Sequence, residues 1–168
     1  MLKSKKKITA LYRLIIQFFF KTIYGKIIFK EKILENNFIK KLKIKKKKFG
    51  INYCVYIVKK GRIYTDNSQN VAGIQNNKLY GEISFQIKNH KIVNPKYNSV
   101  LSKGTPRFKK EINGTVLSTV QGGSGTNYFH WLFEILPKIR ICKEIKNLKQ
   151  IDYIYVPKYS KSQLETLK

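Results

Sequence analysis

The chain has 168 residues, enough for one domain of ordinary size, and a formal net charge of +26 from 35 basic and 9 acidic residues. Lysine supplies most of that charge, and isoleucine and asparagine are also abundant. All three have AT-rich codons, so charge alone is weak evidence for a function. Two cysteines, Cys54 and Cys142, are too few for a disulfide framework or a zinc site, and we predict that both are reduced and structural.

Residues 1–50 are predicted to form a basic, amphipathic N-terminal helical region. Residues 8–29 are apolar, but Arg13, Lys21 and Lys26 interrupt them. The longest uncharged run between these cations is too short to cross a bilayer, and no small-residue cleavage site of a signal peptide follows. The pattern is typical of a helix that lies on an anionic membrane surface.

We therefore expect a helix from about residue 9 to residue 29 that does not span a membrane. The alternative is a helix packed on the protein core with solvated lysines. A second basic run at residues 40–48 is predicted to be a solvated linker or a further membrane-facing patch.

Residues 51–120 are predicted to be rich in β-strands, beginning with the apolar strand 51–58. Asparagine-containing turns at residues 75–77 and 88–90 predict hairpins, and His90 is interpreted as a solvated turn residue. Asp66 is a lone carboxylate, so no metal site is assigned. The shorter predicted strands are 62–65, 71–74, 78–80, 83–87 and 91–93.

The stretch 121–137, Q-G-G-S-G-T-N-Y-F-H-W-L-F-E-I-L-P, joins a glycine-rich turn to an apolar, aromatic segment. Its capping residues predict a helix that begins near Asn127. At about 100° per residue, Asn127, His130, Glu134 and Lys138 lie within about 80° of one another. Because the other side chains are almost all apolar, we expect a buried helix whose polar stripe finds partners or faces a cleft.

His130 and Glu134 are spaced i and i+4, so their side chains can touch on a helix. A carboxylate beside an imidazole fixes its tautomer and raises its basicity, which suits a general base. A structural His–Glu pair inside a core also explains the spacing. The amides freed by Gly122, Gly123 and Gly125 are candidates to bind an anion or a sugar hydroxyl, although the glycines match neither the P-loop nor the G-x-G-x-x-G pattern.

The last third of the chain predicts a β-α-β unit, and hence an α/β fold. We expect residues 116–120 and 151–156 to be neighbouring parallel strands, with the helix 127–145 on one face of their sheet. That helix is predicted to bend or end near Pro137, which lacks a backbone donor. A second helix is predicted at 160–167. Residues 51–168 would then form one incomplete α/β domain.

The run N-Y-F-H-W-L-F-E-I-L-P resembles glycosyltransferase family 61, a group that includes capsular polysaccharide biosynthesis proteins. The resemblance covers about a tenth of the chain. Lys138 stands where many members have arginine, and Glu134 where aspartate is commoner. The positions that match are Asn127, His130, Trp131, Leu132, Glu134, Leu136 and Pro137.

The resemblance implies a GT-B-like protein with two Rossmann-like domains, of which this chain would be the N-terminal portion. It implies an inverting transfer from a nucleotide sugar to a glycan hydroxyl, without a metal or other cofactor. His130 and Glu134 would form the catalytic base, either one taking the proton, and Asn127 and the glycine turn would position the substrate. The nucleotide sugar would bind a second domain, so we expect no transfer by these 168 residues alone.

Two other classes of function remain open. A basic nucleic-acid-binding protein is favoured by the charge, but arginine is scarce and no nucleic-acid-binding motif is present. A non-catalytic, membrane-associated scaffold built on the N-terminal helix is the other alternative. For the transferase we expect a cytoplasmic location, peripheral on the inner face of the membrane, with a glycan acceptor and an anionic membrane surface as partners.

Overall fold

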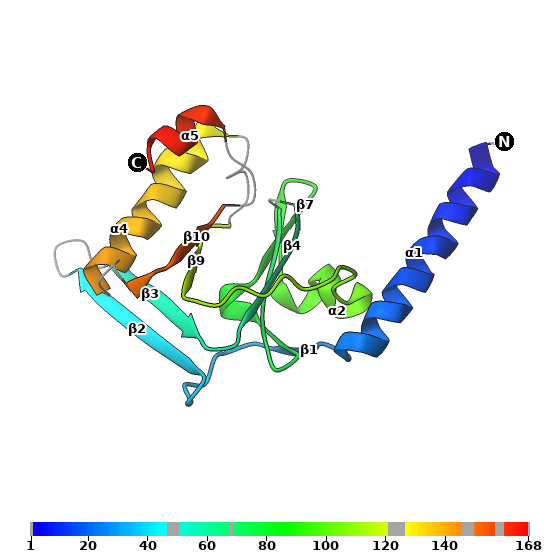
Figure 1. Cartoon of the computed structure of the whole chain (residues 1–168), viewed down its shortest axis with the longest axis horizontal. Coiled ribbons are helices and arrows are strands. Elements are labelled where there is room, and N and C mark those ends of the chain that lie inside the picture. The colour runs from blue at the N-terminus through cyan, green and yellow to red at the C-terminus, as the bar shows by residue number, and fades with distance from the viewer. Residues whose placement is uncertain are drawn as a thin grey trace.

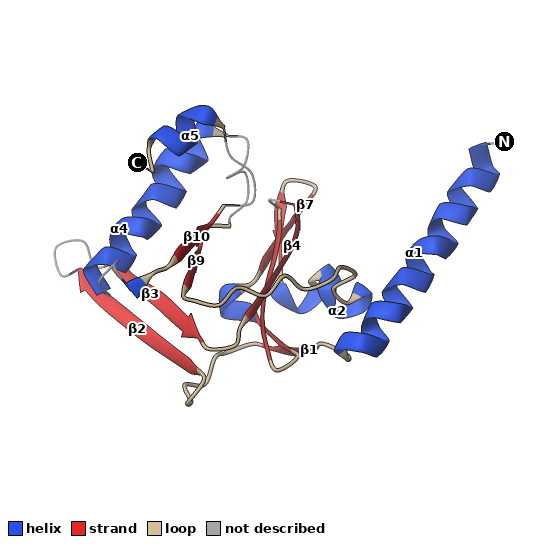
Figure 2. Ribbon diagram, in the orientation of Figure 1, coloured by secondary structure: helices blue, strands red, loops and turns tan. Residues whose placement is uncertain are grey.

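The computed structural model of the chain describes residues 2–46, 51–67, 69–120, 127–145, 150–156 and 160–167. The described part is a mixed α/β structure, with short strands between a projecting helix at one end and a smaller helical group at the other (Figure 1, Figure 2). The longer helical elements are α1 (Leu2–Tyr24), α2 (Ser99–Lys103), α4 (Leu136–Ile145) and α5 (Lys161–Glu165). The strands are β1 (Ile28–Lys30), β2 (Ile39–Lys46), β3 (Ile51–Val58), β4 (Arg62–Asn67), β5 (Asn70–Gln75), β6 (Lys78–Tyr80), β7 (Phe85–Lys88), β8 (Lys91–Val93), β9 (Val116–Ser118) and β10 (Tyr153–Tyr155).

Strand β5 is the centre of the largest sheet, and every one of its residues is buried. β4, β6 and β7 all pair with it antiparallel, β8 continues antiparallel from β7, and β1 pairs parallel with β6. The predicted strands of this region are therefore confirmed, although residues 81–83 form a short 3-10 turn instead of the start of β7. The pairing of β1 with β6 joins segments about 50 residues apart.

Both predicted hairpin turns are confirmed, and asparagine chemistry explains them. Asn76 and Asn77 have φ angles of 48° and 54°, and Asn89 and His90 have φ angles of 51° and 60°. Two successive residues with positive φ give the turn whose twist matches that of paired strands, and asparagine tolerates this conformation better than most residues. His90 is exposed in its turn, as expected.

Helix α1 is confirmed, but it begins about seven residues earlier and ends five residues earlier than predicted. Gly25 has a φ of 77°, and its N–H donates to the carbonyl of Lys21 at 2.9 Å. A glycine in the left-handed region caps the last turn and redirects the chain, which then joins the sheet as β1. Among the described residues, no helix combines the length and hydropathy that a membrane crossing needs.

The lysine run at residues 40–48 was predicted to be a solvated linker or a membrane-facing patch. Its residues up to Lys46 instead form strand β2, so the linker prediction is wrong for this part. β2 pairs antiparallel with β3 at eight positions. The apolar strand β3 needs hydrogen-bond partners for its backbone, and lysines are well tolerated on a strand that leaves one edge to solvent. The predicted boundary at residue 50 therefore falls between two paired strands, and residues 1–50 are not all helical.

Two groups of buried apolar side chains hold these elements together. The first packs α2 and the segment before β1 against the central sheet. The second packs the segment between β1 and β2, together with the first residue of β2, against β6. The buried members are Ile27, Ala72, Ile74, Leu79 and Val100 in the first group. They are Ile33, Ile39 and Tyr80 in the second.

One carboxylate, Glu82, ties the β2–β3 hairpin to the central sheet. Its Oε1 accepts from Lys41 Nζ at 2.7 Å and from Tyr56 Oη at 2.8 Å, and its Oε2 accepts from the Ile33 N–H at 2.6 Å. The ammonium of Lys41, and next the Ile33 N–H, hold the pKa of Glu82 well below its usual value, at about 2. Helix α4 packs against β3 and β2, so this joint also fixes where the helix of the candidate site lies.

Candidate functional site

The candidate site lies on the helix that follows β9. Asn127 begins this helix as its N-cap, and its side-chain oxygen accepts from the Phe129 N–H at 2.9 Å. The predicted start is therefore confirmed. The cap occupies one lone pair of the carboxamide oxygen, which leaves its second lone pair and the amide donors of Asn127. Gly122, Gly123 and Gly125, the other predicted substrate-binding residues, lie outside the described residues.

The helix passes Pro137 without ending, through a wider turn. Residues Tyr128–His130 are α-helical, Trp131–Ile135 form a π-helical turn, and α4 continues to Ile145. The Leu136 N–H donates to the carbonyl of Trp131, five residues back. Pro137 has no N–H to place in the regular ladder, and one wide turn accommodates the break. The prediction that the helix ends near this proline is therefore wrong, whereas the predicted bend stays a prediction. π-Helical turns are frequent at functional sites.

His130 and Glu134 are brought together by this helix. His130 Nδ1 lies 2.9 Å from Glu134 Oε1, and the two side chains are 33% and 31% exposed. That distance is short enough for an ion pair, yet among the described residues Nδ1 has no partner in hydrogen-bonding geometry. The two groups are thus close but not aligned for a hydrogen bond.

Lys138 and Cys142 follow His130 and Glu134 on the same face of the helix, each four residues after the one before. Burial lowers the pKa of the Lys138 ammonium, while Glu134 and Cys142 act in the opposite direction. Burial raises the pKa of the Cys142 thiol, and Lys138 partly offsets that rise. Lys138 belonged to the predicted polar stripe. Cys142 was missed, although its spacing from Lys138 was the available signal.

The helix was predicted to be buried on all its apolar faces, but only one of them is buried. Trp131 and Ile135 are fully buried, and Trp131 Nε1 donates to Thr166 Oγ1 at 2.8 Å. Phe129 and Phe133, however, are 60% and 64% exposed, and their ring centroids lie 4.7 Å apart. The prediction is wrong on this face, because nothing among the described residues covers these rings.

The two predicted strands around the helix pair as expected. β9 and β10 are parallel, with Val116 opposite Tyr153 and Ser118 opposite Tyr155. Just beyond β9, the Thr119 N–H and hydroxyl both donate to the Tyr155 carbonyl. Among the described residues the pair is a separate two-stranded sheet that does not join the central one. The helix follows the carboxyl end of β9, where α/β folds place ligands.

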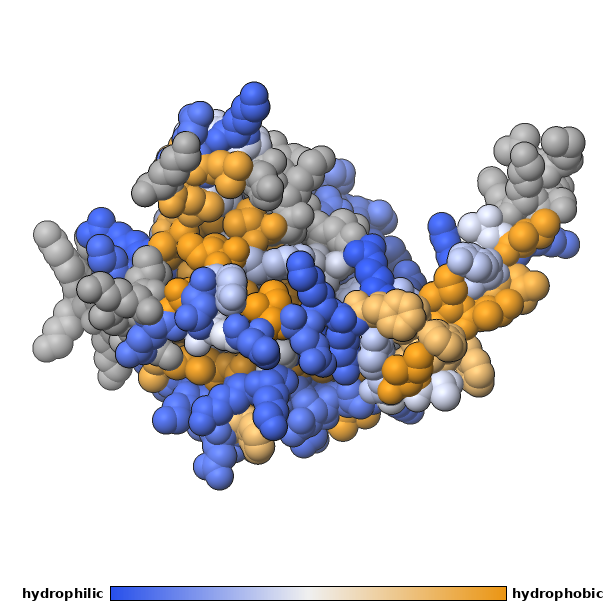
Figure 3. Space-filling model, in the orientation of Figure 1, coloured by the Kyte–Doolittle hydropathy of each residue, from blue (hydrophilic) through white to orange (hydrophobic). Residues whose placement is uncertain are grey.

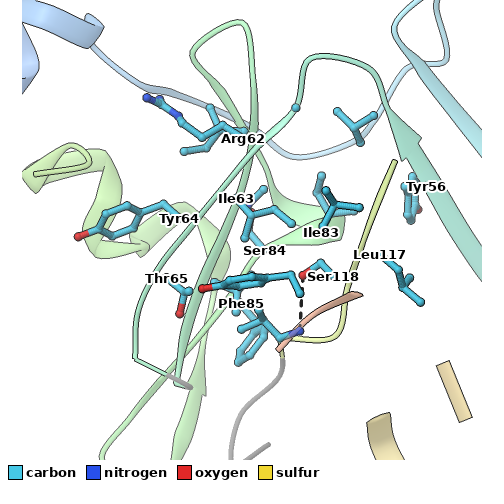
Figure 4. Close-up of a pocket in the computed structure, with 18 of the residues that line it drawn as sticks. Tyr56, Arg62, Ile63, Tyr64, Thr65, Ile83, Ser84, Phe85, Leu117 and Ser118 are labelled. Atoms are coloured by element: carbon cyan, nitrogen blue, oxygen red, sulfur yellow. Dashed lines mark hydrogen bonds between the residues drawn. The ribbon is translucent and has the colours of Figure 1, made fainter. Parts of the chain in front are cut away.

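A broad, open cleft of about 2200 Å³ lies between this unit and the central sheet. His130, Glu134 and Lys138 line it on the helix side. Figure 4 shows lining residues from the strands, with Arg62 and Tyr64 from β4 and Ser118 from the end of β9. The sequence-predicted pair thus reaches a cleft that segments distant in the sequence build together.

Arg62 is a cleft residue that sequence reasoning did not single out. Both of its terminal nitrogens are buried, and neither has a hydrogen-bond partner among the described residues. Its guanidinium lies over the Tyr24 ring, 5.6 Å from the centroid, and Lys109 Nζ lies 4.3 Å from the same centroid. Burial lowers the pKa of this guanidinium. Its position at the start of a strand gave no signal of this in the sequence.

Comparison with family models, with curated proteins and with solved structures finds no match for the chain. No group of three or more potential metal ligands occurs in the part of the chain that the structure describes.

Proposed function

We propose that the chain is the N-terminal portion of an inverting glycosyltransferase, which moves a sugar from a nucleotide sugar to a glycan hydroxyl. One observation carries the proposal: the 2.9 Å contact of His130 Nδ1 with Glu134 Oε1 on the wall of the cleft. A carboxylate beside one imidazole nitrogen favours a proton there and leaves the other nitrogen free to act as a base. The motif of residues 127–137, which resembles glycosyltransferase family 61, supports the same assignment.

In the proposed reaction His130 Nε2 takes the proton from the acceptor hydroxyl. The hydroxyl oxygen forms its bond to the anomeric carbon as the bond from that carbon to the nucleotide's phosphate oxygen breaks. The nucleotide leaves with that electron pair, and the sugar inverts. Glu134 orients the ring and stabilises the imidazolium that forms. The resemblance implies that the nucleotide sugar is held by a second Rossmann-like domain, and none of the described residues is assigned to it.

The surroundings of the pair fit a sugar acceptor. Phe129 and Phe133 expose their rings beside His130, and exposed aromatic rings suit the apolar face of a sugar. Lys138, one turn beyond Glu134, places a cation at the same wall. These groups would hold the acceptor against the helix face that carries His130, so that its hydroxyl lies beside the base.

Kinetics of the complete gene product test the assignment. His130→Ala should lower the transfer rate by about 10²–10⁴-fold, the usual contribution of a general base. Glu134→Gln keeps the shape of the side chain but removes its charge, and should lower the rate less. Near-normal turnover by both variants, with folding verified by thermal melting, would refute the assignment.

A second measurement tests the contact without relying on transfer. The chain has two histidines, so imidazole NMR signals of a histidine-labelled sample separate His130 from the exposed His90. Glu134→Gln should move the His130 signals and leave those of His90 in place. Glu144→Gln is the matched control, because Glu144 pairs with Arg140 at the same i,i+4 spacing on the same helix. Unmoved His130 signals in Glu134→Gln would contradict the contact itself.

A further inference from the structure

Helix α1 projects from the body, and its described contacts with the body lie near its C-terminal end (Figure 1). Phe20 is buried there and meets the Phe108 ring edge-on, with centroids 5.0 Å apart. Tyr24 accepts a hydrogen bond from the Lys109 N–H at 3.1 Å through its hydroxyl. The turns before Phe20 are largely exposed.

The projecting turns carry an exposed apolar face, visible as the orange band along α1 in Figure 3. Its members are Ile8, Leu11, Tyr12, Leu14, Ile15, Phe18, Phe19 and Ile23, all between 49% and 74% exposed. At about 100° per residue they cover an arc of roughly 180°. Phe20 and Tyr24 lie opposite the middle of that arc, so the apolar face points away from the body.

The charge of α1 indicates what this face contacts. The helix contains six basic residues and no acidic one, in a chain with a net charge of +26. Arg13 and Lys21 lie outside the apolar arc, Lys21 about 20° from its edge and Arg13 near the middle of the opposite, polar side. Lys21 can lay its stem along the apolar surface and extend its charge to lipid headgroups. Interfacial helices combine these two features, an apolar face with large side chains and a basic polar face.

We propose that α1 binds the surface of a membrane rich in anionic lipids. The helix lies parallel to the surface, with its apolar face in the boundary between headgroups and acyl chains and the body on the water side. This proposal does not depend on the transferase assignment, since it uses neither His130 nor Glu134.

Other occupants of the face fit less well. A coiled-coil partner uses a seam of two positions per heptad, much narrower than this arc. Nucleic acid binds through the cations and leaves the aliphatic and aromatic side chains exposed. Both remain outcomes of the test.

Vesicle flotation tests the proposal on the full chain. It should float with vesicles of phosphatidylglycerol and phosphatidylcholine in about equal amounts, and only weakly with phosphatidylcholine alone. Leu11→Ser with Phe18→Ser, both inside the arc, should reduce flotation at least tenfold, about the effect of losing one buried apolar side chain. The matched control is Leu34→Ser with Ile92→Ser, two residues 79% exposed elsewhere, and it should float like the wild type.

A second variant tests whether binding requires the basic residues of α1. Arg13→Gln with Lys21→Gln should weaken flotation about tenfold on anionic vesicles, and added salt should do the same. Equal flotation with neutral vesicles, or undiminished flotation of the Leu11/Phe18 variant, would overturn the proposal. So would a wild-type chain that stays off the vesicles and instead dimerises, or binds RNA, through α1. Circular dichroism of each variant verifies that the exposed substitutions leave the fold intact.

Discussion

Replacing Glu82 with alanine should loosen the β2–β3 hairpin from the central sheet. The carboxylate accepts three hydrogen bonds, from Ile33, Lys41 and Tyr56, at 2.6–2.8 Å. A hydrogen bond to a charged group contributes about 1.5–3 kcal/mol. Solvent reaches the Lys41 and Tyr56 donors, which reduces their share, whereas the partly buried Ile33 N–H is left without its acceptor. We expect the variant to lose about 2 kcal/mol of unfolding free energy in total.

Thermal melting measures this loss. For a chain of this length, about 2 kcal/mol corresponds to a decrease in Tm of roughly 4–8 °C. Tyr56→Phe is the matched control, because it removes one of the three donors and keeps the ring, and it should cost only about 0.5–1.5 kcal/mol. If Glu82→Ala were no more destabilising than Tyr56→Phe, the carboxylate would not be the joint between hairpin and sheet.

The pH dependence gives a second test of the same carboxylate. The contacts lower the pKa of Glu82 in the folded chain from 4.5 to about 2. A carboxylate with a lowered pKa stabilises the fold fully above its unfolded pKa, and this contribution is lost as the pH falls through its folded pKa. The stability difference between wild type and Glu82→Ala should therefore be constant above pH 4.5 and shrink towards pH 2. The large net charge is nearly the same in both proteins, so it does not mask the trend. A difference undiminished at pH 2 would contradict the assignment.

Three further predictions concern the cleft and its helix. Asn127→Ala removes the helix cap and should cost about 1 kcal/mol by chemical denaturation, most of which Asn127→Ser should restore. Arg62→Met should leave Tm unchanged or higher, because the buried guanidinium has unmet donors and methionine keeps the apolar stem. A drop of several degrees would mean that the contact of the guanidinium with the Tyr24 ring outweighs the cost of those donors. By mass spectrometry, an alkylating reagent should label the exposed Cys54 at neutral pH but not Cys142, whose burial raises its thiol pKa, until the chain unfolds.

Much of the local structure depends on interactions between residues that are close in the sequence, so it could be predicted from the sequence alone. Asparagines at both hairpin turns, the cap at Asn127 and the i,i+4 spacing of His130 and Glu134 each act within a few residues. Ser160 is a further case, since it forms a capping box with Gln163 at the start of α5. The parallel pairing of β9 and β10 also follows, because a helix between two strands favours a parallel crossover.

The contacts between segments that are distant in the sequence could not be predicted, because they depend on the tertiary structure. The lysine-rich β2 is a strand because β3 needs a backbone partner, and residues 28–30 leave the helical pattern to pair with β6. The exposed rings of Phe129 and Phe133, the unmet donors of Arg62 and the cleft itself depend on which surfaces remain uncovered after packing. Local sequence patterns fix backbone preferences over a few residues. Burial is a property of the whole packed chain, so the pattern of one helix could not show which of its apolar faces would find a partner.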